Sequence, residues 1–269
     1  MRGKAMLLFV MLAMLSFSLV YASPVNIPTS ISSKEGAFLS NEDRQNMGAG
    51  KEEEVDVSAS FVFDNLSERK MKDYSAKAQA NFFAGKLAVT LIDTFDIYAL
   101  FGGMSNAEYK GIAADSDVKL NLEDKFMWGV GLSTIVYEWE NSGFALFADG
   151  NYRSIQDIDL ESATIDGTEY QKPDILDVSA KWQEWQFAFG VSKKFKYFIP
   201  YVGGKYSDVK AGAKATVSGT TYDAGNTKSK NKVGLFIGAS IVPTKGIFID
   251  LQGRFIDEQA FSVTATLKF

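Results

Sequence analysis

The chain has 269 residues, enough for one domain with a sizeable buried surface, and a formal net charge of −5 at pH 7. It has no cysteine, which excludes disulfides, thiolate metal sites and a lipid anchor on cysteine, and no histidine, which removes the commonest general base and metal ligand. A mildly acidic chain without a basic block is also a poor candidate for binding nucleic acid.

Residues 1–22 have the pattern of a secretory signal peptide. Arg2 and Lys4 give a positive start, and Met6–Leu15 is an uninterrupted apolar run. Small residues follow around Ala22, so the sequence predicts cleavage after Ala22 or Ser23. The alternative is a membrane-anchoring helix, but the apolar stretch of about 16 residues is shorter than the roughly 20 that span a bilayer.

Residues 23–53 predict a disordered periplasmic N-terminal extension. The stretch is rich in Ser, Asn, Gly, Glu and Lys, and its few apolar residues keep no regular period. We interpret the run Glu52–Glu54 at its end as a solvated charge patch.

From residue 54 to residue 269, apolar side chains recur at every second position, which is the period of a β-strand. This pattern predicts ten strands, although eight or twelve stay open. In chain order, the predicted strands are Glu54–Asp64, Asp73–Ile92, Phe95–Asn106, Lys125–Trp139, Phe144–Ile155, Val178–Lys193, Tyr197–Ser207, Lys232–Val242, Ile247–Ile256 and Ala260–Phe269.

The second of these strands does not keep one parity. Apolar residues stand at even positions up to Phe82 and at odd positions from Leu87. We therefore expect either a β-bulge near Gly85-Lys86 or a partly helical stretch from Ser67 to Phe83.

Three features favour a transmembrane barrel over a soluble β-sandwich, which is the rival architecture. Many predicted strands have ten or more residues, as a tilted span of a bilayer requires. Aromatic residues gather near strand ends, as in the pairs Phe126/Trp128, Tyr137/Trp139 and Trp182/Trp185. Short turns alternate with mostly longer polar links. The long links are Ala107–Asp124, Gln156–Asp177 and Asp208–Asn231, and the short turns include Asp93-Thr94, Asn141–Gly143, Lys194–Lys196 and Pro243–Gly246.

The predicted fold is therefore all-β: a closed, antiparallel, transmembrane up-and-down β-barrel over residues 54–269, located in the cell outer membrane. Short turns then lie on the periplasmic side and the long links outside. An even strand number puts both chain ends of the barrel in the periplasm.

The last strand carries the clearest family resemblance. Its outward set is Phe261, Val263, Ala265, Leu267 and Phe269. The segment F-S-V-T-A-T-L-K-F resembles the C-terminal signal of outer-membrane barrel proteins, which implies recognition by the barrel-assembly machinery. The stretch Ile199–Gly204 resembles a strand of small OmpA-like and OmpX-like barrels. The sequence predicts no peptidoglycan-binding domain after the barrel, so we do not expect the full OmpA arrangement.

The strand parity also predicts which charged side chains face the lumen. The set contains both signs in near balance, so we expect the charges to pair and to fill a narrow interior. The predicted lumen-facing residues are Asp56, Lys77, Asp96, Asp149, Arg153, Glu184, Lys205, Asp250, Arg254 and Lys268.

The function expected from this pattern is a non-enzymatic outer-membrane protein with an envelope-structural or surface-interaction role. A narrow passage for ions or small solutes is the alternative. The enzymes of this barrel class rely on a histidine base, as the resemblance implies, and this chain has none. We expect no catalytic, cofactor or metal site. Expected partners are outer-membrane lipids and lipopolysaccharide, the barrel-assembly machinery and a surface-loop partner whose identity the sequence does not reveal.

Overall fold

The computed structural model describes residues 24–28, 55–71, 77–91, 94–113, 116–139, 141–171, 177–217, 220–227, 229–244 and 246–269. The predicted signal peptide lies outside these residues, as does the run Glu52–Glu54. Among the described residues, no helix has the length and apolar character needed to cross a bilayer.

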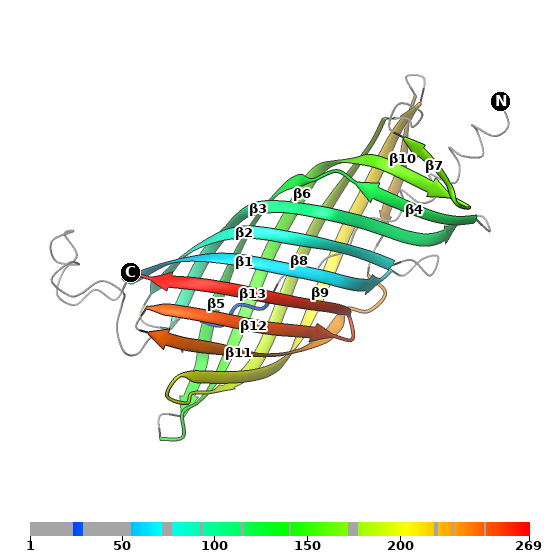
Figure 1. Cartoon of the computed structure of the whole chain (residues 1–269). Helices are drawn as coiled ribbons and strands as arrows, with labels where there is room; N and C mark the ends of the chain where they lie inside the picture. Colours follow the sequence, from blue (N-terminus) through cyan, green and yellow to red (C-terminus); the bar gives the residue numbers. More distant parts are fainter. Residues whose placement is uncertain are drawn as a thin grey trace.

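The described chain is a closed ring of antiparallel strands (Figure 1). Its thirteen strands are β1 (Val55–Lys70), β2 (Lys77–Leu91), β3 (Phe95–Ala113), β4 (Ser116–Leu122), β5 (Lys125–Trp139), β6 (Phe144–Ile165), β7 (Thr168–Gln171), β8 (Asp177–Lys193), β9 (Phe198–Val217), β10 (Thr220–Thr227), β11 (Val233–Thr244), β12 (Ile247–Phe255) and β13 (Glu258–Lys268).

Ten wall positions make up the ring, which confirms the predicted architecture. Each strand pairs with its neighbour in the order β1-β2-β3-β5-β6-β8-β9-β11-β12-β13, and pairing of β13 with β1 closes the barrel. The short strand β4 lies end to end with β5, because both pair with β3 on one side and β6 on the other. Strands β7 and β10 form hairpins with the far ends of β6 and β9.

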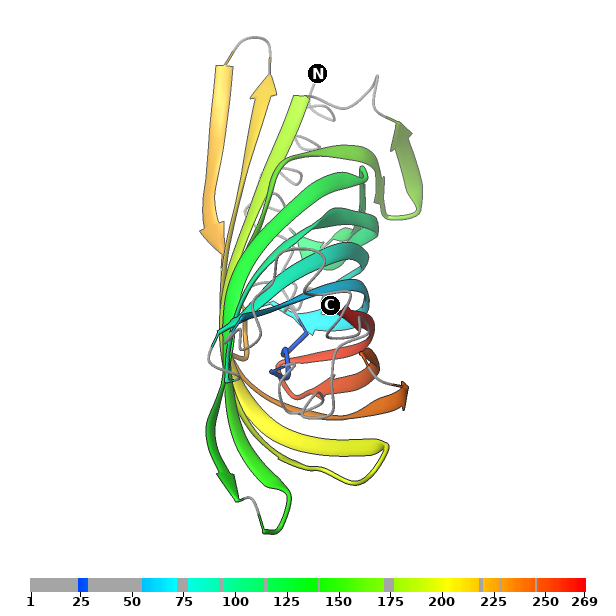
Figure 2. The same ribbon diagram turned by 90° about the vertical axis from the view of Figure 1, so that its left-hand side faces the viewer.

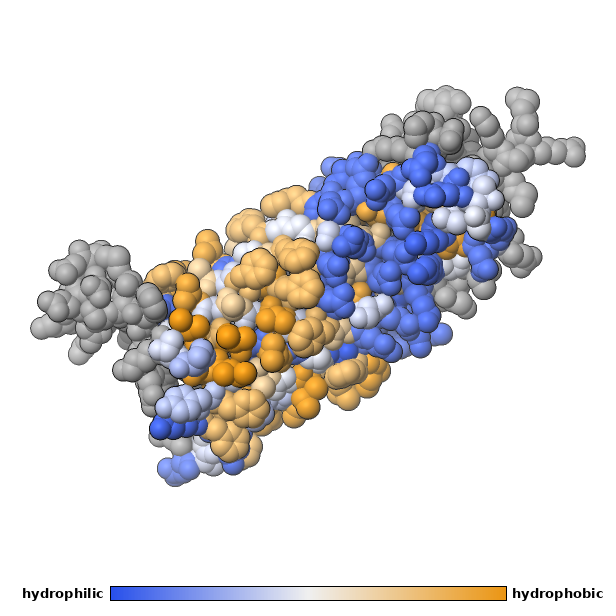
Figure 3. Space-filling view, in the orientation of Figure 1, coloured by the Kyte–Doolittle hydropathy of each residue, from blue (hydrophilic) through white to orange (hydrophobic). Residues whose placement is uncertain are grey.

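The membrane half of the barrel has apolar side chains outside and polar ones inside. Leu235, Ile237 and Phe187 are 49%, 55% and 57% exposed on the outer wall, whereas polar residues of the same strands, such as Ser240 and Gln186, point inward and are buried. Figure 3 shows apolar side chains gathered as a band over the half of the barrel that contains the C-terminus. A soluble sandwich would bury the same apolar set, so the arrangement matches a lipid-facing wall.

We call the two ends of the barrel the turn end and the extension end. The turn end holds Thr94, the links 141–143 and 194–197, and the last residue, Phe269. Gly143 has a φ of +69°, which a side-chain-bearing residue rarely adopts, so this tight turn requires glycine.

At the extension end, the strands continue well beyond the apolar band. The prediction of long links at 107–124, 156–177 and 208–231 is wrong. Strands β3, β6 and β9 instead continue to residues 113, 165 and 217, where they pair with β4, β7 and β10. The outer surface there is polar (Figure 3). Its interior is apolar, with buried side chains that include Tyr109, Leu120, Leu160 and Trp182. Trp182 was predicted to belong to an outer aromatic cluster, and it points inward instead.

Bulges mark the change from the membrane half to the extension. Register shifts occur after Leu66 in β1, between Ser105 and Glu108 in β3, and after Ile155 in β6. Asn106 and Asp157 have positive φ values of 50° and 52° at two of them. Each extra residue moves the following side chains to the opposite face, so the inward parity changes along the same strand.

The prediction of a bulge or a partly helical stretch in β2 is wrong. No bulge lies near Gly85-Lys86, and residues 77–91 are strand throughout. The even residues from Ala78 to Thr90 all face inward, and the odd residues face outward. The apparent parity change arises because the interior takes small or apolar residues near the extension end and polar residues lower down.

We predict that Ile237→Arg, in the middle of the apolar band, lowers the free energy of unfolding by about 2–4 kcal/mol, because the charge must enter hydrocarbon. Glu161→Arg, on the exposed outer face of β6 in the extension, is the matched control and should change it by less than about 0.5 kcal/mol. Urea titration of the protein refolded into lipid vesicles measures both values. Equal effects would contradict the placement of the band.

Candidate functional site

Eight charged side chains meet inside the barrel between its membrane half and the extension, and we call them the ion-pair belt. Four are cationic and four are anionic, so the belt is electrically balanced. Its members are Asp64 and Arg69 of β1, Arg153 of β6, Glu184 of β8, Lys205 of β9, Arg254 of β12, Asp257 of the β12–β13 link and Glu258 of β13.

Glu184 joins two arginines across the lumen. Its carboxylate accepts from Arg69 at 3.4 Å and from Arg153 at 3.3 Å. The same Arg69 guanidinium reaches Glu258 at 3.3 Å and, through a second nitrogen, donates to Ser207 at 2.7 Å. Strand β1 is therefore tied to β8, β9 and β13 through one side chain.

Arg254 completes the other side of the belt. It contacts Glu258 at 2.6 Å and Asp64 at 2.5 Å, and Asp64 also lies 3.6 Å from Arg153. The Arg153 guanidinium stacks over the ring of Phe82, 4.4 Å from its centroid. These cations are thus held by carboxylates and by an aromatic face.

The side chains of the belt are buried from solvent. Every one of its ion-paired side chains is at most 2% exposed. Because an unpaired charge is costly in such a place, each member is fixed by the others. The arrangement is therefore an electrically balanced network inside the barrel.

The turn-end half of the lumen contains a segment from the N-terminus. Residues 24–28 lie inside the ring (Figure 2), and the carboxamide of Gln252 bonds both backbone groups of Val25, accepting from its N–H and donating to its C=O, each at 3.0 Å. The Asn26 side chain donates to Tyr98 at 2.7 Å and accepts from Lys86 at 3.0 Å. For these five residues, the predicted disordered extension needs correction.

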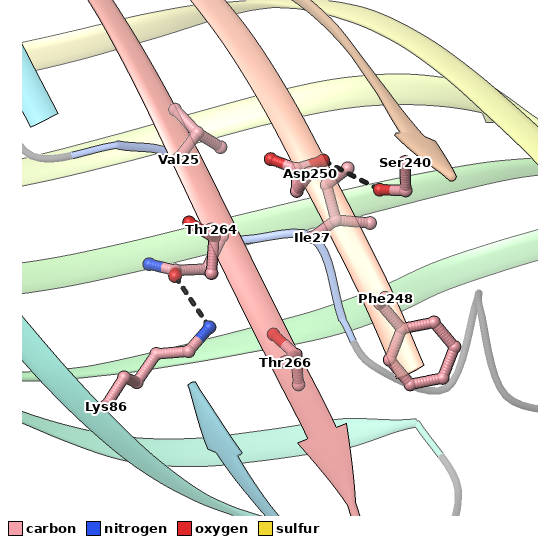
Figure 4. A pocket seen from close by; sticks show the side chains of 9 residues that line it. Val25, Ile27, Lys86, Ser240, Phe248, Asp250, Thr264 and Thr266 are labelled. Carbon is pink, nitrogen blue, oxygen red and sulfur yellow. Dashed lines mark hydrogen bonds between the residues drawn. The ribbon is translucent and has the colours of Figure 1, made fainter. Parts of the chain in front are cut away.

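Acidic side chains surround this segment. Tyr98 donates to Asp149 at 2.7 Å, and Tyr201 donates to Asp250 at 2.9 Å. A cavity of about 30 Å³ lies beside Val25 and Ile27 and is lined by Lys86, Ser240, Asp250 and Thr264, among others (Figure 4). This space is large enough for a water molecule.

The structure places nine of the ten predicted lumen-facing charges inside the barrel. Arg153, Glu184, Lys205 and Arg254 belong to the belt. Asp96, Asp149 and Asp250 lie in the turn-end half, and Asp56 pairs with Lys268 at 2.6 Å. The prediction is wrong for Lys77, which lies on the outer face of β2. Its side chain is 56% exposed and contacts Glu68 at 2.7 Å.

Several interior charged residues are absent from the predicted lumen-facing set. Asp64 and Lys86 carry inward parity, so strict alternation could have found them. Arg69, Asp257 and Glu258 follow bulges or a tight turn, and simple alternation does not predict their direction. Ile256 illustrates the constraint: this β-branched residue has a φ of 81° in the turn that aims the next two carboxylates inward.

The predicted C-terminal set faces outward. Phe261, Leu267 and Phe269 are exposed, Ala265 is exposed, and Val263 is half-buried. Strand β13 pairs with both β12 and β1, so these side chains line the wall at the point where the barrel closes.

A second hollow lies on the outer face of the extension. It has a volume of about 340 Å³ and is lined by Lys77, Lys110, Lys119, Asp117 and Thr164, among others. Glu108 beside it contacts both Lys110 and Lys119. Burial raises the pKa of Glu108, but the hydrogen bonds and charges of the two lysines outweigh it and hold this pKa below its usual value.

The described part of the chain contains no group of three or more carboxylates that could hold a metal ion. Asp157 occupies a bulge, and Asp159 contacts Lys125 at 2.6 Å.

The most informative sequence relatives are porins. No protein-family model matches the chain. The major outer membrane porin of Chlamydia muridarum is 23% identical over 325 residues, covering 90% of this chain and 79% of that protein. The major outer membrane porin of Chlamydia trachomatis serovar D is 24% identical over 131 residues, covering 35% of this chain and 33% of that protein.

Solved structures similar to this one include the outer membrane protease OmpT from Escherichia coli, with a TM-score of 0.45, 10% identity and coverage of 80% of this chain and 95% of that one. OprG from Pseudomonas aeruginosa is also similar, with a TM-score of 0.39 and 11% identity, and the match covers 82% of this chain and 98% of that one. The porin relatives, the closed ring and the apolar band together place this protein in the outer membrane as a β-barrel. Membership of the OmpA-like and OmpX-like group stays a prediction.

We predict that Arg254→Met lowers the free energy of unfolding by about 3–5 kcal/mol, because Asp64 and Glu258 lose a buried partner. Lys77→Met removes an exposed cation from an ion pair and should lower it by less than about 1 kcal/mol. Urea unfolding in detergent micelles compares the two. Similar losses would show that the belt is no more important than a surface pair.

The Glu108 cluster predicts a pH dependence. The pKa of Glu108 is lowered in the folded protein. The contribution of Glu108 to stability is therefore complete above its ordinary pKa of 4.5 and is lost as the pH falls through the lowered pKa. Wild type should therefore exceed Glu108→Gln in unfolding free energy at pH 7, and the difference should shrink at about pH 3. An unchanged difference would contradict the ion-pair explanation.

Proposed function

We propose that this outer-membrane barrel is a non-enzymatic protein that is closed to solutes and acts through its outer surfaces. The observation that supports this most is the ion-pair belt, whose charged side chains pair across the lumen and are buried from solvent. On the extension side of the belt the interior is packed with apolar side chains, and on the turn-end side residues 24–28 occupy the space. A solute would have to disrupt three successive layers.

The proposed orientation puts the turn end in the periplasm and the extension end outside the cell, because short turns face the periplasm in such barrels. The extended hairpins of β3/β4, β6/β7 and β9/β10 then form a rigid, polar platform above the lipid. This platform, with its lysine-lined hollow, is the proposed contact surface for an external partner. The apolar band would contact outer-membrane lipid and lipopolysaccharide, and the C-terminal strand would be recognised by the assembly machinery.

A narrow channel is the second candidate, and two observations favour it. The sequence relatives are named porins. The turn-end half of the lumen carries several carboxylates, and Asp96, Asp149 and Asp250 all lie close to the ammonium of Lys86. Such a passage would prefer cations.

Planar-bilayer recording separates the two functions. We predict that the refolded protein adds no unitary current steps above the bare bilayer at neutral pH, because no member of the belt can leave without stranding a buried charge. Stable unitary steps with cation selectivity would contradict closure and establish the channel. Hydrolysis assays on peptide and lipid substrates should show no turnover; turnover would contradict the non-enzymatic proposal.

A further inference from the structure

The turn-end half of the lumen surrounds residues 24–28 with side chains from several strands. Gln252 comes from β12, Tyr98 from β3 and Lys86 from β2. The Val25 side chain packs with Phe147, Tyr201 and Phe236, which come from β6, β9 and β11. The contacts therefore come from most of the circumference of the barrel.

We propose that this half of the lumen is a binding site for a short extended peptide, and that the chain's own residues 24–28 occupy it as a plug. The inference rests on the barrel geometry and not on the function proposed above. The plug bonds Gln252, Tyr98 and Lys86, none of which belongs to the belt, so its test is separate from any test of the belt.

Recognition has a part that any peptide would satisfy. The Gln252 carboxamide offers one acceptor and donors, and it bonds the N–H and C=O of the same residue, as a neighbouring strand would. The carboxamide is itself fixed, because it also donates to the Tyr201 hydroxyl at 3.1 Å. This pair of bonds requires an extended backbone at the bound residue.

A second part of the recognition is specific for sequence. The Asn26 carboxamide is read at both ends, because Lys86 donates to its oxygen and Tyr98 accepts from its nitrogen. Its backbone N–H also bonds Asp149. Val25 is 2% exposed in its apolar pocket. The site thus fits an apolar residue followed by asparagine.

The prolines of the segment suit it to this role. Pro24 and Pro28 flank the three central residues, and each proline restricts the residue before it to extended backbone. A segment that is already extended loses less entropy on binding. The predicted cleavage after Ala22 or Ser23 leaves this segment at the start of the mature chain, where a free end can enter the barrel mouth.

The wall is also shaped around the site. A Cβ atom at Gly131 would collide with the Tyr98 ring, and one at Gly238 would collide with Tyr201. Both tyrosines can lie across the lumen only because these positions carry no side chain. Without the segment, Lys86 would lose Asn26 and Gln252 would lose both bonds to Val25 in a buried place, which is costly.

Thiol labelling tests whether the plug is in place, since the natural chain has no cysteine. In the refolded chain lacking residues 1–22, Val25→Cys should react with a water-soluble maleimide at least tenfold more slowly than Ser142→Cys in an exposed turn. Adding Gln252→Leu to Val25→Cys should raise its labelling rate at least tenfold. Adding Gln186→Leu, a buried lumen glutamine with no contact to the segment, should not. Equal rates for the two cysteines, or no effect of Gln252→Leu, would overturn the proposal.

A peptide experiment tests the site from the ligand's side. A fluorescent peptide of residues 23–29 should bind the variant lacking residues 24–28 and should bind the full chain at least tenfold more weakly, because the site there is filled in cis. The same peptide with Asn26→Ala should lose at least fivefold of its affinity. No binding to the deletion variant, equal binding to both proteins, or indifference to Asn26 would overturn the proposal. Heat-modifiable gel migration confirms that each variant is folded.

Discussion

The structure depends on one constraint: every charge that the strands turn into the lumen must find a partner from another wall. Arg69 on β1 reaches Glu184 on β8, and Arg254 on β12 reaches Asp64 on β1. These contacts join strands that are not neighbours in the ring, so they fix the cross-section that main-chain pairing alone leaves open. Because removing either partner leaves a buried charge alone, the belt acts as one unit.

The same strands meet two solvents, and their polarity changes accordingly. In the membrane half, the apolar face meets lipid, and the interior holds charged side chains together with an apolar cluster around Phe147 and Phe236. In the extension, water takes the polar face and the interior takes residues such as Leu120 and Leu160. The bulges at Asn106 and Asp157 lie between these regimes, and each shifts the parity by one residue. A single closed sheet therefore combines a lipid-facing cylinder with a water-facing platform whose interior resembles a soluble core.

Sequence patterning predicted the ring well and its interior only in part. Alternation of period two set ten strands, and the starts of β3, β5, β6 and β12 agree with the structure, because lipid on one side enforces that period. The extensions of β3, β6 and β9 were missed because the polarity signal reverses there. Arg69 was missed because a bulge precedes it. Residues 24–28 offer no periodic signal at all, since their place depends on a pocket built by strands far away in the chain.

A double-mutant cycle between Arg69→Met and Glu184→Gln tests the central claim most directly. The two residues meet across the lumen at 3.4 Å, and no wall pairing joins β1 to β8. If the belt holds opposite walls together, the unfolding free energies deviate from additivity by about 1–3 kcal/mol. Additivity within about 0.5 kcal/mol would contradict the account, because it would mean that the walls do not communicate through these charges.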